Sequence, residues 1–325
     1  MILEQTPKLT GNEPGVPTSK VVHPAGTALY PGPFWAAVAL LIVCFSVPLL
    51  DLLRLALSDD LYSDAPLMPV ISLYLIWQKR DKLPNLSKPS WLMASLFFGA
   101  GILAVAAGQV VDSFVPVAPV DHLAANICGF VLLLAGLCFA FLGPRITRAI
   151  AFPLGLMVFM IPLPEFARHY IETFLQYGSA MVAQSFFAMG GMPSQLHGIF
   201  FQLPGINLEV APECSGIHSS LVLLILSLIA GYRYLRSPWR RTVLALAVIP
   251  LGLLRNGFRI FVIGQLCVRY GPQMLDSPIH RHGGPLFFAL SLIPFFPLLF
   301  FLNRTERTKP GPGQEPHIKG QPTKG

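Results

Sequence analysis

Residues 122–142 read HLAANICGFVLLLAGLCFAFL, and this stretch decides the fold class. It contains no Asp, Glu, Lys or Arg, and about 20 apolar residues in a helix are enough to cross ~30 Å of hydrocarbon. The stretch therefore predicts a membrane-spanning helix. Similar blocks recur, and we expect about eight spans, over residues 34–57, 62–78, 91–110, 122–142, 146–163, 215–233, 242–263 and 285–302.

The composition of the 325-residue chain agrees with a membrane protein. Only 12% of the residues are charged and 53% are hydrophobic, whereas a soluble domain carries about 25% charged residues. These values argue against a soluble globular protein, a disordered chain, a disulfide-rich secreted scaffold and a nucleic-acid-binding protein. The cysteines form no CxxC pair and no zinc-binding spacing; they are Cys44, Cys128, Cys138, Cys214 and Cys267.

The expected domain organisation is one membrane domain between two tails. Residues 1–33 are polar and rich in Pro and Gly, which predicts a disordered tail rather than a cleavable signal peptide. Residues 304–325 predict a second disordered tail, and residues 34–303 form the multispanning domain. The predicted fold class is an all-α integral membrane protein.

Basic residues predict the orientation of this domain. Lys and Arg cluster after the second, fourth, sixth and eighth expected spans, whereas the loops 59–64 and 111–121 have neither. The positive-inside rule therefore places the basic loops and both termini in the cytoplasm. The last outer loop, near residues 268–284, has only Arg269 and Arg281.

The segment between the fifth and sixth expected spans differs from a simple crossing. Residues 164–191 predict a helix, but its polar positions weaken it as a span, so we expect it along the outer membrane face or as a shallow re-entrant segment. Residues 198–214, GIFFQLPGINLEVAPEC, have short alternating apolar runs broken at Pro204-Gly205. This pattern predicts a short β-hairpin-like segment before Cys214.

The topology brings polar residues from three distant segments to one outer layer. Cys214 lies at the mouth of the sixth expected span, and Arg255 and Arg259 share one face of the seventh. Ionisable residues within spans are costly and indicate function. The other members of this layer are Asn256, beside Arg255, and His280 and His282, before the eighth span.

Several interpretations of these residues stay open. A helix N-terminus lowers the pKa of a thiol and apolar surroundings raise it, so a reactive Cys214 needs a cationic partner. Cys214 is otherwise a buried apolar residue, or forms a disulfide with Cys267. The arginines Arg255 and Arg259 either snorkel to lipid headgroups or face the bundle. In the second case they stabilise a thiolate or an oxyanion, or bind the anionic substrate of a transporter or lipid-carrier protein.

The histidines have alternatives as well. His280 and His282 are either surface residues of a turn or a general acid/base for the thiol. His218, four residues after Cys214, is a rival base. Glu213 either orients a histidine or faces solvent. A metal-binding membrane protein is a further alternative, because Cys and His together suit transition metals; its ligands would be Cys214, His218, His280 and His282.

Three motifs in this order resemble the exosortase/archaeosortase family. They are VAPECSGI at 210–217, NGFRI at 256–260 and HRHGG at 280–284, followed by Phe288. IPLP at 161–164 also resembles the core of the family. The resemblance covers about residues 90–305. In the family an aromatic residue often follows the glycine that corresponds to Gly284, whereas this chain has Pro285 at that position.

The resemblance implies a membrane cysteine transpeptidase or protease of the bacterial inner membrane, with its active site on the periplasmic face. Such enzymes cleave C-terminal sorting signals, typically of the Pro-Glu-Pro type, on exported proteins in which a transmembrane helix and a basic tail follow, and they accompany exopolysaccharide production. By motif, Cys214 is the nucleophile, with Arg259 and His280 as the second and third catalytic residues.

The remaining residues have lesser implied roles. Arg255 and Asn256 support Arg259, whereas His282 lies outside the family's register. Glu213 and His218 are further supporting candidates. Besides exported substrates, the expected partners are membrane lipids, and no nucleic acid, metal or cofactor is expected. The chain contains neither GxxxxGK[ST] nor HExxH.

Overall fold

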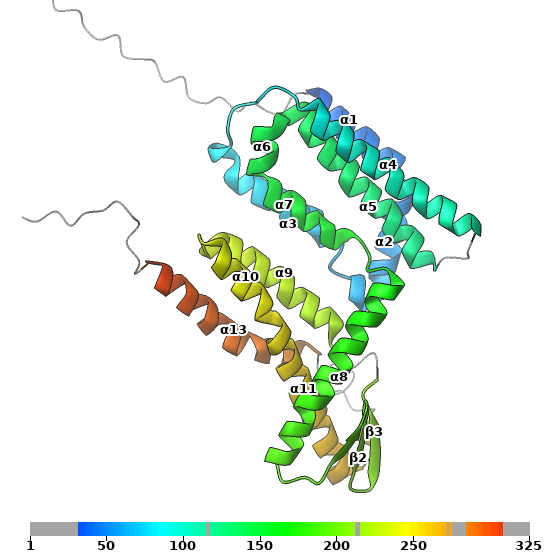
Figure 1. Cartoon of the computed structure of the whole chain (residues 1–325), viewed down its shortest axis with the longest axis vertical. Helices are drawn as coiled ribbons and strands as arrows, with labels where there is room; N and C mark the ends of the chain where they lie inside the picture. Colours follow the sequence, from blue (N-terminus) through cyan, green and yellow to red (C-terminus); the bar gives the residue numbers. More distant parts are fainter. Residues whose placement is uncertain (1–31, 115–117, 212–214, 272, 275–283, 308–325) are drawn as a thin grey trace, which may run out of the picture.

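The computed structural model describes residues 32–114, 118–211, 215–271, 273–274 and 284–307. These residues form a bundle of helices with a small sheet at one end (Figure 1). The helices are α1 (Gly32–Cys44), α2 (Ser46–Ser58), α3 (Leu67–Lys79), α4 (Trp91–Phe114), α5 (Pro119–Leu137), α6 (Gly143–Ala149), α7 (Ala151–Leu156), α8 (Glu165–Met189), α9 (Ile217–Tyr234), α10 (Pro238–Leu246), α11 (Val248–Tyr270) and α13 (Gly284–Arg307). The strands are β1 (Gln195–His197), β2 (Phe200–Leu203) and β3 (Ile206–Glu209).

The predicted all-α membrane class is confirmed, but the count of eight spans is not. Within the described residues, 5 helices are long and apolar enough to cross a membrane, or up to 7 if each of two bent helix pairs is one span. The second expected span corresponds to α3, whose 13 residues are about 20 Å long at 1.5 Å per residue. That length falls short of the ~30 Å of hydrocarbon.

The chain bends where single spans were predicted. Helices α1 and α2 meet at 65°, and the segment Ala151–Met160 meets α8 at 90°. Residues 146–163 are not one helix, because α6 and α7 are followed by a 3₁₀ turn over Met157–Met160. Pro162 and Pro164 then prevent a helix from continuing into α8 without a break.

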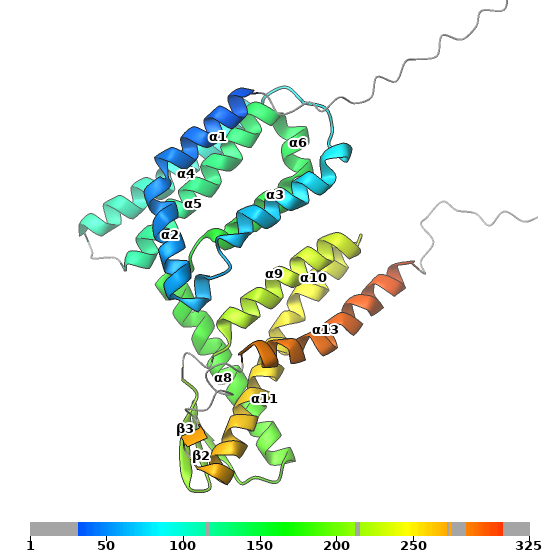
Figure 2. The ribbon, with the colours of Figure 1, turned by 180° about the vertical axis from the view of Figure 1, so that it is seen from behind.

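Two groups of parallel helices form the bundle. One contains α1, α4 and α5, with α2 turned away from the axis of α1, and the other contains α9, α10 and α13, as both views show (Figures 1 and 2). The first group packs through a core that includes Leu52, Ile127 and Phe130, and the second through Leu244 and Phe295. Within the first group, α4 and α5 approach closely because Gly129 leaves room for Val105.

Helix α8 runs across the ends of the other helices and packs along the outer half of α11 (Figure 1). The predicted helix over 164–191 is therefore confirmed, although Pro164 precedes its first residue. Asp121 at the start of α5 fixes this end, since its Oδ1 accepts a hydrogen bond of 2.7 Å from the backbone N–H of Glu165. Nearby, the Tyr62 hydroxyl donates to the Leu163 carbonyl at 3.4 Å, and burial raises the pKa of Tyr62 to about 12.

The sheet has the antiparallel order β1-β2-β3 and leads directly into the segment that precedes α9. The predicted hairpin is β2 and β3, in which Leu203 pairs with Ile206 across the turn at Gly205. Gly205 has a φ of +80°, which favours glycine. Phe201 is completely buried against Phe187 of α8. Strand β1 was not predicted, because three residues carry too little of the alternating pattern.

Candidate active site

The structure describes part of the residue set that the sequence singled out. Arg255, Asn256, Arg259 and His218 are described. The other candidates lie outside the described residues, so their predicted roles stay predictions; they are Glu213, Cys214, His280 and His282. What the structure does show is how the chain on either side of Cys214 is held.

Buried side chains hold the backbone on both sides of Cys214. Before it, the amide of Gln176 on α8 donates to the carbonyl of Val210 at 2.9 Å. After it, Asn256 Nδ2 on α11 donates to the carbonyl of Ser215, the next residue in the chain, at 3.1 Å. Two of the predicted motifs, VAPECSGI and NGFRI, are therefore in direct contact.

Arg255 makes the next contact along this segment. Its Nη2 donates to the Gly216 carbonyl at 3.1 Å and to Ser220 Oγ at 3.4 Å. Only 5% of Arg255 is exposed, so the snorkelling interpretation is wrong for this residue. A buried guanidinium is costly unless it is paired and hydrogen-bonded, which indicates that it lies at a site rather than in a core.

Asn256 joins α11 to α8 and to the segment that precedes α9. Besides Ser215, its Nδ2 donates to Ser179 Oγ of α8 at 3.0 Å. Asn256 and Ser179 are 2% and 0% exposed, and a buried polar group that loses its partner costs about 1–3 kcal/mol. Sequence reasoning missed Ser179 and Gln176, because polar residues on an amphipathic helix are most often on its solvated face.

Gly216 allows this close contact. It precedes α9 with a φ of +73°. A Cβ at this position would lie 2.7 Å from Arg255 Nη2 and 3.2 Å from Asn256 Cγ. Any other residue would be strained in its backbone and would also displace the two side chains that hold the segment.

Replacing Gly216 by alanine is therefore expected to reduce activity at least about 10-fold, because a ~1 Å displacement at a site costs up to about 100-fold in rate. The matched control is Gly205→Ala, whose φ is +80° but whose Cβ would meet nothing within 4 Å. It carries the same backbone strain without the overlap. Activity measurements on the two purified variants test this. Equal activities would show that the contact with Arg255 and Asn256 is unimportant.

Arg259 lies one turn after Arg255 on the same face of α11 and is partly buried. This placement agrees with the sequence prediction that both arginines face one side. The packing of α11 against α8 at the intervening residue is tight, since a Cβ on Gly257 would lie 2.6 Å from Val182 Cγ1. The outer half of α11 is thus fixed relative to the anchored segment.

His218 in the first turn of α9 has a carboxylate partner that sequence reasoning missed. Its Nε2 lies 3.1 Å from Asp64 Oδ2 and 3.5 Å from Ser63 Oγ. Asp64 belongs to an expected outer loop that contains three aspartates and no Lys or Arg. The three aspartates were the one feature of this loop in the sequence that indicated a contact with a polar group elsewhere in the chain.

One of the alternative interpretations loses support, and the metal-binding alternative stays a prediction. Cys267 is a free, buried thiol, so it does not form the suggested disulfide with Cys214. The described residues contain no group of three His, Cys, Asp or Glu side chains that could hold a metal ion. Of the four suggested ligands, only His218 is described, and it pairs with Asp64.

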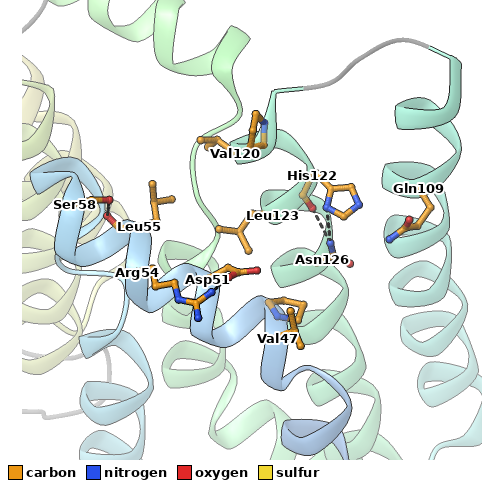
Figure 3. Close-up of a pocket in the computed structure, with 12 residues that line it drawn as sticks. Val47, Asp51, Arg54, Leu55, Ser58, Gln109, Val120, His122, Leu123 and Asn126 are labelled. Carbon is orange, nitrogen blue, oxygen red and sulfur yellow. Dashed lines mark hydrogen bonds and ion pairs between the residues drawn. The ribbon is translucent and has the colours of Figure 1, made fainter.

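A cavity of about 860 Å³ lies between α2, α4 and α5, away from the segment around Cys214 (Figure 3). Four of its polar residues form two local pairs. Arg54 donates to Asp51 at 2.8 Å, and Asn126 donates to the His122 carbonyl at 3.0 Å. The cavity is lined by α2, α4 and α5, whereas residues 210 and 215–216 are held by α8 and α11. The cavity is therefore separate from the segment around Cys214.

These features define a multi-pass α-helical membrane protein in which a buried arginine and asparagine hold a short segment between a sheet and a span. The family model for transmembrane exosortase (Exosortase_EpsH) matches residues 56–297. The chain therefore belongs to the transmembrane exosortase family, and the resemblance seen in the sequence is confirmed. No curated protein and no solved structure matches the chain. Membership implies a membrane cysteine transpeptidase or protease.

Proposed function

We propose that the protein is a membrane cysteine transpeptidase or protease that cleaves C-terminal sorting signals of exported proteins through a thioacyl-enzyme intermediate. The observation that supports this most is the anchoring of the chain on both sides of Cys214 by Gln176, Arg255 and Asn256. A nucleophile needs a fixed position, because misplacement of a reacting group by about 1 Å can cost 100-fold in rate.

The proposed reaction has two acyl-transfer steps. The Cys214 thiolate attacks the scissile carbonyl, the C–N bond breaks, and His280 gives a proton to the leaving amine. An acceptor amine or water then gives its proton to His280 and attacks the thioester carbonyl, which releases the thiolate. Arg259 stabilises the thiolate or the oxyanion of the tetrahedral intermediates by donating hydrogen bonds.

Two sources of positive charge lie next to the segment that contains Cys214 in the sequence. The segment immediately precedes α9, an 18-residue helix whose N-terminal end carries a partial positive charge. The guanidinium of Arg255 is bound two residues after Cys214, at Gly216. Positive charge close to a thiol lowers its pKa and raises the fraction of reactive thiolate at neutral pH.

The proposed location is the bacterial inner membrane, with cytoplasmic termini and the site on the periplasmic face. The start of α1 and the end of α13 lie on the side of the bundle away from the sheet and α8 (Figures 1 and 2). Basic residues lie on the same side as these ends, including Arg240, which donates to the Leu302 carbonyl of α13 at 2.8 Å. This arrangement supports the orientation that the basic loops predict.

A cleavage assay tests this function. The full chain is co-expressed with an exported reporter that ends in a Pro-Glu-Pro signal, a transmembrane helix and an Arg-rich tail. We expect a shortened reporter only when the enzyme is present, and none when the signal is scrambled. A reporter that stays intact beside correctly inserted enzyme would contradict the proposal and favour the transporter alternative, which also uses a buried arginine.

A further inference from the structure

An apolar cleft of about 310 Å³ lies between α8, α11 and α13. Of its nine lining residues, only Arg255 and Ser291 are polar. The rim residues Leu254, Leu290 and Ile293 are 48%, 40% and 67% exposed. Because α11 and α13 belong to two of the candidate spans, the cleft opens sideways, toward the lipid.

Arg255, one of the residues that line the cleft, carries a charged donor without an acceptor among the described residues. Arg255 Nη2 is bonded to Gly216 and Ser220, but Nη1 is buried and has no hydrogen-bond partner within the described part of the chain. Ser291 does not accept this proton in the structure, and its own hydroxyl donates to the Phe288 carbonyl at 2.6 Å. A buried donor that is charged and unpaired is costly, so the cleft fits a ligand that brings an acceptor.

We propose that this cleft binds the exported substrate where its sorting signal enters the transmembrane helix, with Arg255 Nη1 donating to a backbone carbonyl of the substrate. This inference rests on the proposed function. The apolar rim contacts side chains on one face of the substrate helix, which lies along α11 and α13. The cleft is too small for a whole helix, and it sits at the lower end of the ~300–1,000 Å³ that ligand pockets occupy.

The geometry favours a peptide over a lipid. A lipid acyl chain has no hydrogen-bond acceptor for Arg255. A phospholipid headgroup carries several charges, whereas only Arg255 and Ser291 of the nine residues that line the cleft are polar. A chain segment that precedes a helix brings neutral backbone carbonyls between apolar side chains, and these carbonyls do not accept the N–H···O=C bonds that occupy the carbonyls within the helix. Nη1 and Nη2 of Arg255 are both bonded to Cζ, and Nη2 donates to the Gly216 carbonyl. A substrate carbonyl bound to Nη1 at about 2.9 Å therefore lies close to Gly216, two residues after Cys214.

Photo-crosslinking from the cleft tests the docking site directly. Benzoylphenylalanine replaces Ile293 or Leu254 in the full chain, which is expressed in membranes with the tethered reporter. The matched control is Leu103 of α4, which is 67% exposed on a helix outside the cleft. We expect crosslinks to the reporter helix from 293 and 254 and none from 103. Crosslinks to phospholipid alone, or equal yields at all three positions, would overturn the inference.

A kinetic comparison separates docking from chemistry. Leu290→Trp narrows the cleft, and Leu103→Trp is its control. For Leu290→Trp we expect KM for the tethered reporter to rise about 10-fold, which corresponds to the ~1.4 kcal/mol lost with part of one apolar contact, and kcat for a soluble signal peptide to stay unchanged. An unchanged KM would contradict the docking site. Failure of the unmodified enzyme to cleave either substrate would instead contradict the proposed function, while the crosslinks would still decide the docking site.

Discussion

Cys214→Ala is expected to abolish cleavage of the reporter, with a loss of at least about 10³-fold in rate, because removal of a nucleophile removes the whole covalent route. The protein should still insert and fold. The contacts that hold the segment are made by the carbonyls of Val210, Ser215 and Gly216, and none of these groups is changed. Reporter cleavage per molecule of membrane-inserted enzyme measures the effect.

The control for this variant is Cys44→Ala. Cys44 is an exposed free thiol at the end of α1, and its removal should leave the rate within about twofold. If Cys214→Ala retained more than a few per cent of the activity, a thioacyl intermediate would be ruled out. The metal-binding alternative predicts instead that bound metal falls when Cys214 is replaced, which elemental analysis of the purified protein detects.

Arg259→Ala is expected to have the second-largest effect, a fall in kcat of about 10²–10³-fold, as found when one donor to a developing oxyanion is removed. Arg259 lies on the face of α11 that carries Arg255, whose guanidinium reaches the residue two positions after Cys214. Arg259→Lys keeps the charge but not the forked donor geometry, so we expect it to recover only part of the rate.

Arg269→Ala is the matched control, since it removes an exposed arginine from the last turn of the same helix. For Arg269→Ala we expect an unchanged kcat. The two variants should have similar unfolding temperatures. The catalytic role of Arg259 would be excluded if Arg259→Ala matched Arg269→Ala in kcat. A lower unfolding temperature for Arg259→Ala with unchanged kcat would assign it to structure alone.

Sequence predicted those parts of the fold that depend on local patterns. The helix over 164–191 and the hairpin at Pro204-Gly205 follow from periodicity and from a turn that needs a glycine, and both are present. The breaks between α1 and α2 and within 146–163 were not predicted. An apolar stretch of sequence has the same composition whether its helix is straight or bent. Packing against neighbouring helices determines whether the helix bends.

The site shows the same division. Arg255 and Arg259 are four residues apart, so the sequence alone predicts that they share one face of a helix. The sequence does not predict that Asn256 bonds Ser179 and Ser215, because these partners are 77 and 41 residues away in the chain. The pair of His218 and Asp64 spans 154 residues. Contacts of this kind depend on how helices from distant segments are placed, which no local pattern encodes.

The most direct test of the central claim is mass spectrometry of the Cys214 peptide after acid quenching of the full-length enzyme during turnover of the reporter. We predict an adduct on Cys214 with the mass of the reporter fragment that precedes the cleavage site, released by hydroxylamine as a thioester is. Cleaved reporter that accumulates while Cys214 stays unmodified, or an adduct on another residue, would contradict the account.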